Sequence, residues 1–205
     1  MVATQRGTTA YVESLFKNLP VRRRELEKNI KREWGKVVGI LGQYACISTG
    51  VKFTVTHQAS KGYFYLSKVQ LWCLFCSSKK TTVFSTRGNP TTRENIINVF
   101  GAKTLTALVP LDLKLEIIPT SGGHQRSQIE EDTSTKDVHV VGHISRPVFG
   151  EGRQTPDRQM FFVNGRPCGL PQVSKAINEV YKSFNVSQSP FIFADIRLNT
   201  RKFHP

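Results

Sequence analysis

The spacing of apolar residues predicts one long helix near the start of the chain. Between residues 22 and 46 apolar residues recur at steps of three and four, the period of a helix with one buried face. That predicted face consists of Leu26, Ile30, Trp34, Val37, Val38, Leu41 and Tyr44. Pro20 lies near the first turn, where a missing N–H costs little. The other face is basic, and part of that charge is a solvated surface with intrahelical pairs such as Glu27 with Lys31.

Strands are predicted where apolar and polar residues alternate, or where β-branched and aromatic residues cluster. The predicted strands span residues 10–16, 51–57, 81–86, 111–118, 137–144, 160–163 and 191–198. The second and third of these are expected to pair as a hairpin. Short helices are predicted after the capping residue Thr91 or Thr92 and around residues 104–108, and a last helix ends near Asn185.

Two segments interrupt this pattern. Residues 63–78 form a continuous aromatic and apolar run inside the predicted hairpin, where a short polar loop is expected. The run is too short and too interrupted for a membrane span, which needs about twenty apolar residues. Residues 119–136 are polar, contain Gly122-Gly123 and lack aromatic residues, and therefore predict a flexible loop.

Residues 159–177 combine a strand, a turn and the start of a helix. The apolar run from Met160 to Val163 breaks at Asn164-Gly165, and these two residue types tolerate positive φ, so the strand is predicted to end in a tight turn. The turn presents Arg166. An ordinary strand-turn-helix corner without a ligand is the alternative interpretation.

Charge adds the first functional indication. At 205 residues the chain fits one sizeable domain, with 29 Lys and Arg against 15 Asp and Glu and a net charge of +14. Such an excess favours a polyanionic partner, nucleic acid before membrane, although a solubilising surface is the alternative. The polar loop 150–158 carries Arg153 and Arg158, and binding residues concentrate in loops of this kind.

The cysteines and histidines do not predict a metal site. The pair Cys73 and Cys76 has no second pair at zinc spacing and no redox context. His139 and His143 would lie about 13 Å apart on a strand, too far for one metal ion. Few cysteines and no signal peptide indicate a reducing, intracellular compartment. The chain also lacks a nucleophile–base pair and a glycine-rich phosphate loop, which argues against an autonomous enzyme.

Three segments resemble the MutL family of DNA mismatch repair proteins. Residues 6–22 carry the order Arg-Gly-Thr-Thr-x-x-Val-x-x-Leu-Phe-x-Asn-Leu-Pro-Val-Arg, which resembles the motif that closes the family's ATPase module. Residues 95–101, Asn-Ile-Ile-Asn-Val-Phe-Gly, also fit. Residues 161–168, Phe-Phe-Val-Asn-Gly-Arg-Pro-Cys, followed by Asn-Glu-Val-Tyr at 178–181, are similar to the PMS-type branch in particular.

The resemblance implies the second half of the family's N-terminal GHKL ATPase region. This is a single transducer domain over residues 1–205, with an α+β fold in which helices pack on one face of a mixed, ribosomal-protein-like sheet. Its implied function is to couple ATP binding and hydrolysis to dimerisation and to binding of mismatched DNA. The family's ATP and Mg²⁺ motifs precede Gly7, and its Asn-Val-x-Pro-x-Lys motif follows the last strand, so we expect a fragment that binds neither alone.

The resemblance also implies site residues and partners. Thr8 and Thr9 match threonines at the edge of the nucleotide pocket. The basic DNA-binding position of bacterial relatives falls at Pro171-Gln172 here, so Arg153, Arg158, Arg166 and Lys175 are candidate substitutes, with a solvated rim as the alternative. The implied partners are DNA, a MutL-type partner subunit and MutS-type mismatch recognition proteins in the nucleus, and no membrane.

The apolar run at 63–78 departs from the family pattern. Without it, Lys61-Gly62 would meet Lys79-Lys80, which reads as a short polar hairpin. We interpret the run as translated intron or a gene-model error, which sequencing of the transcript would test. An RNA-binding or ribosomal-type structural domain is the alternative to a mismatch repair function.

Overall fold

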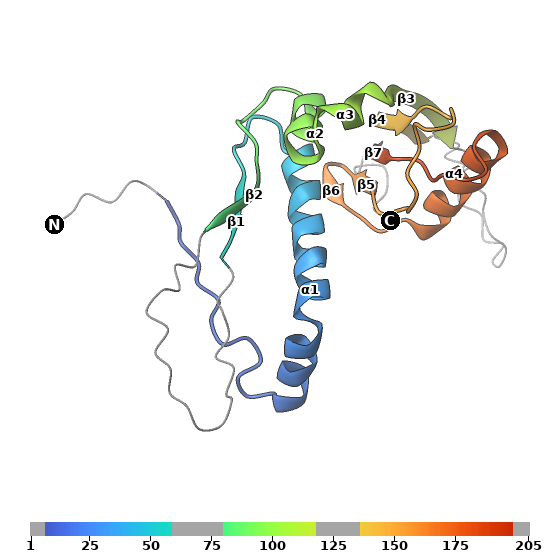
Figure 1. Cartoon of the computed structure of the whole chain (residues 1–205). Helices are drawn as coiled ribbons and strands as arrows, with labels where there is room; N and C mark the ends of the chain where they lie inside the picture. The colour runs from blue at the N-terminus through green and yellow to red at the C-terminus, as the bar shows by residue number, and fades with distance from the viewer. Residues whose placement is uncertain (1–6, 59–79, 118–135, 199–205) are drawn as a thin grey trace, which may run out of the picture. The chain divides into compact units, whose positions relative to one another are not determined.

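The computed structural model describes residues 7–58, 80–117 and 136–198 and divides the chain into two compact units, residues 1–39 and 40–205 (Figure 1). Helix α1, Pro20–Ile47, carries the chain from the first unit into the second. The run at 63–78 lies outside the described residues. So does the predicted flexible loop at 119–136, except for Lys136, which begins a strand.

In the first unit, the strand predicted at residues 10–16 is wrong. Ser14 and Phe16 have positive φ of 51° and 63°, and Lys17 and Leu19 donate turn hydrogen bonds to the carbonyls of Ser14 and Phe16. Tyr11 and Val12 are more than four-fifths exposed. Alternation predicts a buried face only where a neighbouring strand can pair with the backbone, and the described residues of this unit contain no such strand.

Helix α1 begins at Pro20, two residues before the predicted start at residue 22, and its predicted apolar face is not the buried one. Ile30 and Val37 remain 53% and 45% exposed, whereas Gly42, Ala45 and Cys46 are buried. Burial depends on a partner surface, and the last turns of the helix lie against α2. A methyl group built on Gly42 would stand 3.5 Å from Val99 Cγ1. The periodicity therefore predicted the helix correctly, but it predicted the wrong side of the helix to be buried.

The predicted hairpin is confirmed. Strands β1, Thr54–His57, and β2, Thr81–Ser85, pair antiparallel, with Thr54 opposite Ser85 and His57 opposite Thr81. Helix α2, Thr92–Phe100, begins at the predicted cap, where Thr91 Oγ1 accepts a hydrogen bond from the amide of Glu94. Helix α3, Ala102–Thr106, starts two residues before the predicted helical turn.

The larger sheet has five strands in the order β3-β4-β7-β5-β6. Their bounds are β3 Leu108–Ile117, β4 Lys136–Ser145, β5 Gln159–Val163, β6 Arg166–Pro167 and β7 Ile192–Leu198, with helix α4 at Pro171–Phe184 before β7. Strand β5 is parallel to β7 and the other pairs are antiparallel, so the sheet is mixed, as expected. Strand β6 was not predicted, because two residues are too short to show a pattern.

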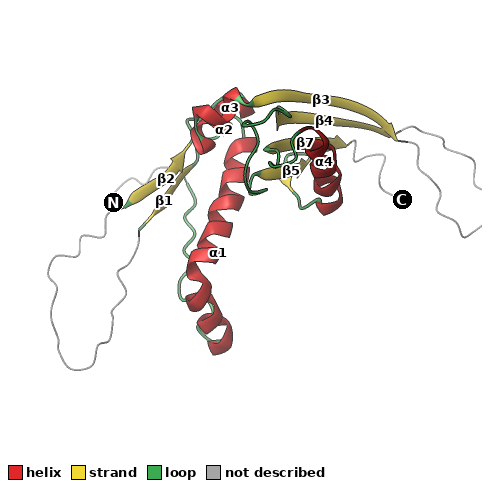
Figure 2. Cartoon of the chain, turned by 45° about the vertical axis from the view of Figure 1, so that its right-hand side comes forward, coloured by secondary structure: helices red, strands yellow, loops and turns green. Residues whose placement is uncertain are grey.

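Apolar side chains cover both faces of this sheet. Figure 2 shows the strands of the sheet with helix α4 next to them. Met160, Phe162 and Phe193 point to the face that carries α2 and the end of α1, while Phe161 and Ala194 point to the face that carries α4. The α+β class and the mixed sheet are confirmed. The helices, however, pack on two faces and not on the single face implied by the resemblance, because successive strand residues alternate sides and both sets are apolar here.

Candidate nucleic-acid interface

The turn between β5 and β6 is fastened to the end of β7 by an asparagine side chain. Asn164 and Gly165 both have positive φ, 48° and 76°, as the sequence predicts. The Asn164 amide donates to the Leu198 carbonyl at 3.1 Å and accepts from the Leu198 amide at 2.8 Å. The Gly165 amide donates to Asp195 Oδ1 at 2.9 Å. The Asn164 backbone amide also donates to the Ile196 carbonyl at 3.0 Å, so all of these hydrogen bonds join the turn to β7.

Arg166 follows this turn as the first residue of β6 and is exposed. Its backbone pairs with Val163, which fixes where the side chain leaves the sheet edge. Asp195, the acidic group near the turn, is 8% exposed and is used by the Gly165 amide and by Arg197, 3.1 Å away. The fold thus presents the Arg166 cation to solvent from a fixed backbone.

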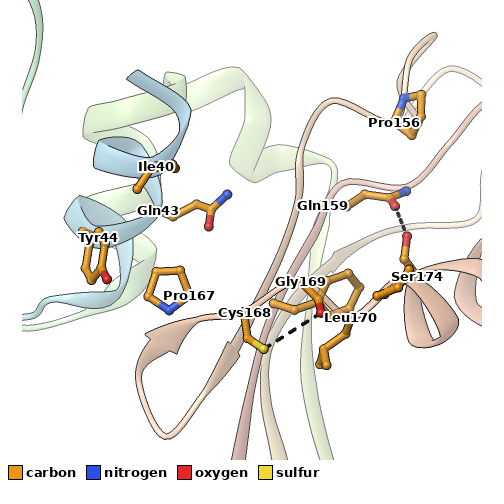
Figure 3. Close-up of a pocket in the computed structure, with 12 residues that line it drawn as sticks. Ile40, Gln43, Tyr44, Pro156, Gln159, Pro167, Cys168, Gly169, Leu170 and Ser174 are labelled. Carbon is orange, nitrogen blue, oxygen red and sulfur yellow. Dashed lines mark hydrogen bonds between the residues drawn. The ribbon is translucent and has the colours of Figure 1, made fainter. Parts of the chain in front are cut away.

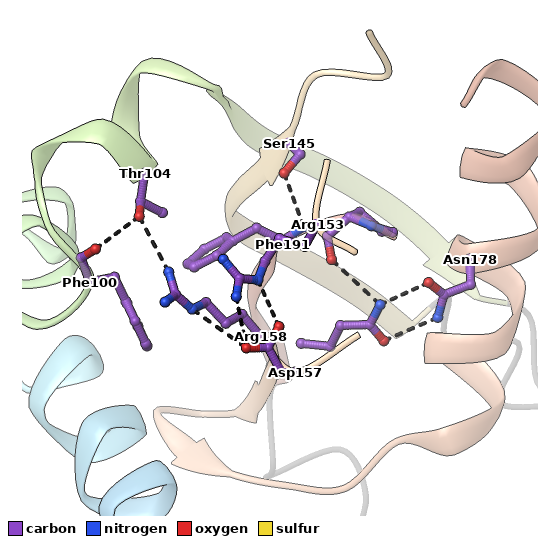
Figure 4. Close-up of polar contacts among 10 residues, drawn as sticks. Phe100, Thr104, Ser145, Arg153, Asp157, Arg158, Asn178 and Phe191 are labelled. Atoms are coloured by element: carbon purple, nitrogen blue, oxygen red, sulfur yellow. Dashed lines mark hydrogen bonds and ion pairs between the residues drawn. The ribbon is translucent and has the colours of Figure 1, made fainter. Parts of the chain in front are cut away.

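Arg153 is engaged inside its own loop (Figure 4). Its guanidinium makes two hydrogen bonds to Asp157, from Nε at 2.7 Å and from Nη2 at 2.8 Å. These bonds hold the pKa of the Asp157 carboxyl below its usual range. The Arg153 backbone also exchanges two hydrogen bonds with Ser189, just before β7. Arg153 therefore closes the loop onto the body of the domain.

Arg158 is half-buried between the loop and the helices that precede β3. Its guanidinium carbon lies 4.8 Å from the centre of the Phe100 ring, and Nη1 donates to Thr104 Oγ1 at 3.4 Å. Burial lowers the pKa of this guanidinium, and the nearby Arg153 acts in the same direction. A cation over a ring in a partly desolvated site contributes to packing.

Lys175 lies on α4 with its side chain 79% exposed, and its Nζ is 3.9 Å from Glu179 Oε1. An exposed pair at this distance contributes little and leaves the ammonium accessible. Thr8 and Thr9 are exposed in the first unit, outside any helix or strand. The four candidate cations thus divide into two that are accessible, Arg166 and Lys175, and two that are engaged internally.

Two polar clusters, which the sequence did not predict, hold β5, α4 and the loop at residues 150–158 in place. Gln159, at the start of β5, accepts from Ser174 Oγ at 2.6 Å and exchanges hydrogen bonds with Asn178, which ties β5 to α4. Gln188 Oε1 accepts from the amides of Gly150 and Gly152 and from the Asn185 side chain, at 2.9 to 3.1 Å. No local pattern in the sequence marks either glutamine, because their partners are distant along the chain.

A hollow of about 560 Å³ lies between the last turns of α1, β5 and the start of α4 (Figure 3). The described residues that line it are uncharged and include Tyr44, Phe161, Pro167 and Leu170, with Cys168 beside them. A lining without cations does not suit a phosphate. The hollow is therefore separate in character from the cationic residues above.

The histidines make ordinary contacts. His139 Nε2 lies 2.6 Å from Asp112 Oδ1, which holds the Asp112 pKa below its usual range, and His143 lies half-buried against the Phe193 ring. Cys73 and Cys76 are outside the described residues.

Nowhere in residues 7–58, 80–117 and 136–198 do three His, Cys, Asp or Glu side chains gather as metal ligands would, so these residues do not fit a Mg²⁺ site. Within the same ranges, no helix has the length and apolarity to cross a bilayer.

Similarity to known proteins supports the resemblance. Residues 119–204 match the family model described as DNA mismatch repair protein, C-terminal domain. The chain is 39% identical over 193 residues to mismatch repair endonuclease PMS2 of Gallus gallus, an alignment that covers 94% of this chain and 20% of that protein. It is 36% identical over 193 residues to DNA mismatch repair protein PMS1 of Arabidopsis thaliana, covering 94% and 17%.

The chain belongs to the MutL family, in its PMS-type branch. The predicted resemblance is confirmed. This MutL-family chain spans about a fifth of the length of these relatives. Its fold matches a solved structure titled "Crystal Structure of N terminal domain of a DNA repair protein", with a TM-score of 0.72 and 34% identity over 89% of this chain and 47% of that one. This match agrees with the α+β class expected from the resemblance.

Proposed function

We propose that this MutL-family domain acts in DNA mismatch repair as a transducer that couples ATP binding and hydrolysis to dimerisation and to DNA binding. The observation that carries the proposal is the likeness to PMS-type mismatch repair proteins over 94% of the chain. The net charge of +14 supports a polyanionic partner. Partners in this scheme are DNA, a MutL-type subunit and MutS-type proteins, and the compartment is the nucleus, since these relatives are eukaryotic.

ATP and Mg²⁺ enter this proposal through residues other than those described, because no set of metal ligands is present among the latter. Thr8 and Thr9, exposed in the first unit, are assigned to the edge of the nucleotide pocket through their hydroxyls. No chemical step is assigned to the described residues.

For DNA, we assign direct phosphate contacts to Arg166 and Lys175. Both side chains are accessible, and Arg166 leaves a turn that is bonded to β7. Arg153 and Arg158 are assigned an indirect part, because their guanidinium groups already bind Asp157, Thr104 and the Phe100 ring. They hold the neighbouring loop in place. Contacts of this kind give affinity without reading sequence.

The salt dependence of duplex DNA binding tests the proposal. The full chain is titrated with a labelled duplex at several salt concentrations, and the logarithm of affinity should fall by about 0.9 per phosphate contact for each unit of log salt concentration. The double variant Arg166→Ala with Lys175→Ala should reduce this slope by about two, since two contacts are lost.

The matched control is Arg22→Ala with Lys182→Ala, which removes the same charge from exposed positions on α1 and α4. An equal loss of slope in both double variants would reject the assignment to Arg166 and Lys175. Absence of salt-dependent duplex binding by the unaltered chain would reject DNA binding by this domain. Tighter binding of a folded RNA than of the duplex would favour the RNA-binding alternative.

A further inference from the structure

The β1–β2 ribbon lies in a part of the chain without acidic residues. None of the 15 Asp and Glu residues falls between Glu33 and Glu94. The described residues beside the two strands include three exposed cations, Lys52, Lys80 and Arg87. Glu94 and Arg87 line one hollow at the base of the ribbon, but among the described residues no ion pair joins them. The Glu94 amide is capped by Thr91. The ribbon therefore keeps its positive charge.

One face of this ribbon is a row of hydroxyl groups. Residues Thr54 and Thr56 of β1 stand opposite Ser85 and Thr82 of β2, and Thr54 Oγ1 lies 3.1 Å from Ser85 Oγ. An irregularity after Val55 absorbs the extra residue Val83, so the hydroxyl side chains stay on one face. Val55 and the buried Phe84 occupy the other face. His57 and Thr81, a paired position at the end of the ribbon, also belong to that other face, so the row of neighbouring hydroxyl groups distinguishes the first face.

The cations extend this hydroxyl face at both ends. The three cations lie one or two residues outside the strands. Continuing the alternation of side chains past the strand ends assigns Lys52 to the face of Thr54, Lys80 to that of Thr82 and Arg87 to that of Ser85. Lys80 and Arg87 are seven residues apart, which corresponds to about 20 Å along an extended strand. We call the set Lys52, Thr54, Thr56, Lys80, Thr82, Ser85 and Arg87 the ribbon face.

The base of the ribbon is fixed by a buried threonine. Thr86 is fully buried, and its hydroxyl accepts from the Phe53 amide at 2.9 Å and donates to the Val51 carbonyl at 3.2 Å. Its own amide donates to the Phe53 carbonyl at 2.8 Å. A rigid base lowers the entropy that the ribbon loses when it binds a partner.

A second network joins this base to the helices. Asn89 donates to the side chains of Asn95 and Asn98, and the fully buried Asn95 donates to the carbonyls of Cys46 and Ser48 at the end of α1. The ribbon is therefore continuous with the hydrogen-bonded body of its unit. Its basic groups project from a fixed support.

We propose that the ribbon face is a second DNA-contacting surface that binds the phosphates of duplex DNA. The proposal rests on the DNA-binding function proposed above. Lys, Arg, Ser and Thr side chains supply most contacts to phosphate, and a two-stranded ribbon is narrow enough to enter the major groove of B-form DNA. The major groove of A-form RNA is deep and too narrow for such an element, so the partner is duplex DNA.

The test compares two triple variants of the full chain. Lys52→Ala with Lys80→Ala and Arg87→Ala removes the cations of the ribbon face. Arg22→Ala with Lys103→Ala and Lys182→Ala removes the same charge from exposed positions elsewhere. The ribbon triple should lower the salt slope of duplex binding by about three, while the control triple should leave it within about 0.5 of the unaltered chain.

The hydroxyl groups give an independent readout. Thr54→Val with Thr82→Val keeps charge and shape but removes two neutral contacts, so it should weaken duplex binding several-fold and leave the salt slope unchanged. Circular dichroism of each variant checks that the fold persists. Lys52→Arg with Lys80→Arg keeps both positive charges, so this variant should bind the duplex with the affinity of the unaltered chain.

The outcomes separate this proposal from the function on which it rests. In one outcome the ribbon triple keeps the salt slope of the unaltered chain while the Arg166 and Lys175 double variant has a lower one. That result overturns the proposed ribbon surface and leaves the proposed DNA-binding function standing. An equal decrease of the salt slope in the ribbon and control triples also overturns the ribbon surface. Such a result would mean that the total positive charge of the chain attracts DNA, without local contacts at the ribbon face. No salt-dependent duplex binding by the unaltered chain overturns both, as does stronger binding of a folded RNA hairpin than of the duplex.

Discussion

The loop at residues 150–158 and the β1–β2 ribbon leave the core of the same unit, and each is fastened by one buried polar side chain. Gln188 holds the loop by accepting hydrogen bonds from the Gly150 and Gly152 amides, and Thr86 holds the ribbon through its hydroxyl. The loop contains Asp157, which binds Arg153, whereas the described ribbon has no carboxylate.

This difference shows that a basic residue near a recognisable motif is not necessarily available to a ligand. Arg153 and Arg158 lie just before β5, in a loop of the kind where binding residues concentrate, yet their side chains contact Asp157, Thr104 and Phe100. Lys52, Lys80 and Arg87 belong to no motif and are exposed. The contacts that each cation makes, more than the number of cations, therefore decide which of them remain exposed.

The largest effect is expected from removing the acceptor that holds the loop. Gln188→Leu keeps the size of the side chain but leaves the Gly150 and Gly152 amides without their acceptor and removes one of the two acceptors of Asn185 Nδ2. Gln188 is 8% exposed, so we expect a loss of about 3 kcal/mol in the free energy of unfolding. Urea denaturation measures it.

The control for this substitution is Gln172→Leu on the exposed side of α4, which should change the free energy of unfolding by less than about 0.5 kcal/mol. A loss of under about 1 kcal/mol for Gln188→Leu would show that the loop holds itself in place through Arg153 and Asp157, without the glutamine.

A smaller effect separates the two kinds of arginine. Arg158→Ala removes the cation over Phe100 and the bond to Thr104, so we expect a loss of about 1 kcal/mol in stability and an unchanged salt slope for duplex binding. Arg87→Ala should show the reverse: stability within about 0.5 kcal/mol of the unaltered chain and a slope lower by about one.

Thermal unfolding and duplex titration of the same two samples provide both quantities. Arg22→Ala, another exposed arginine, should leave both unchanged. If Arg158→Ala lowers the slope and Arg87→Ala does not, the roles of the loop and the ribbon are exchanged.

The structural features that depend on residues close together in the sequence could be predicted from the sequence. The Asn164-Gly165 turn and the Thr91 cap follow from the conformations and side-chain hydrogen bonds that those residue types favour. The Arg153–Asp157 pair was also within reach, because the two residues are only four apart. Hairpin pairing of β1 and β2 followed from their similar alternation.

Contacts between distant residues could not be predicted in this way. Arg158 and Thr104 are 54 residues apart, and Gln188 is 36 residues from Gly152, so no local pattern links them. Periodicity also predicted a buried face of α1 at Ile30 and Val37, which are exposed. It predicted a strand at residues 10–16 where, among the described residues, no strand forms or pairs with them. A pattern shows which residues can be buried together, and only the fold shows what covers them.

The smallest expected effect is a pH dependence that belongs to the loop and not to the ribbon. The hydrogen bonds from Arg153 hold the pKa of the Asp157 carboxyl below its usual range. A carboxyl whose pKa is lower in the folded state stabilises the protein at pH values above the unfolded-state pKa, and this contribution is lost as the pH falls through the folded-state pKa. Asp157→Asn should therefore lose less stability than the unaltered chain when the pH falls from about 5 to about 2.5.

Asp157 is 47% exposed, so solvent screening keeps the difference small. Asp137→Asn, at an exposed position on β4, serves as the control and should leave the acid-induced loss unchanged. Urea midpoints at closely spaced pH values resolve the comparison. Identical acid profiles for Asp157→Asn and the unaltered chain would mean that the Arg153–Asp157 pair contributes nothing to folding, which would leave Arg153 free to bind phosphate like the cations of the ribbon face.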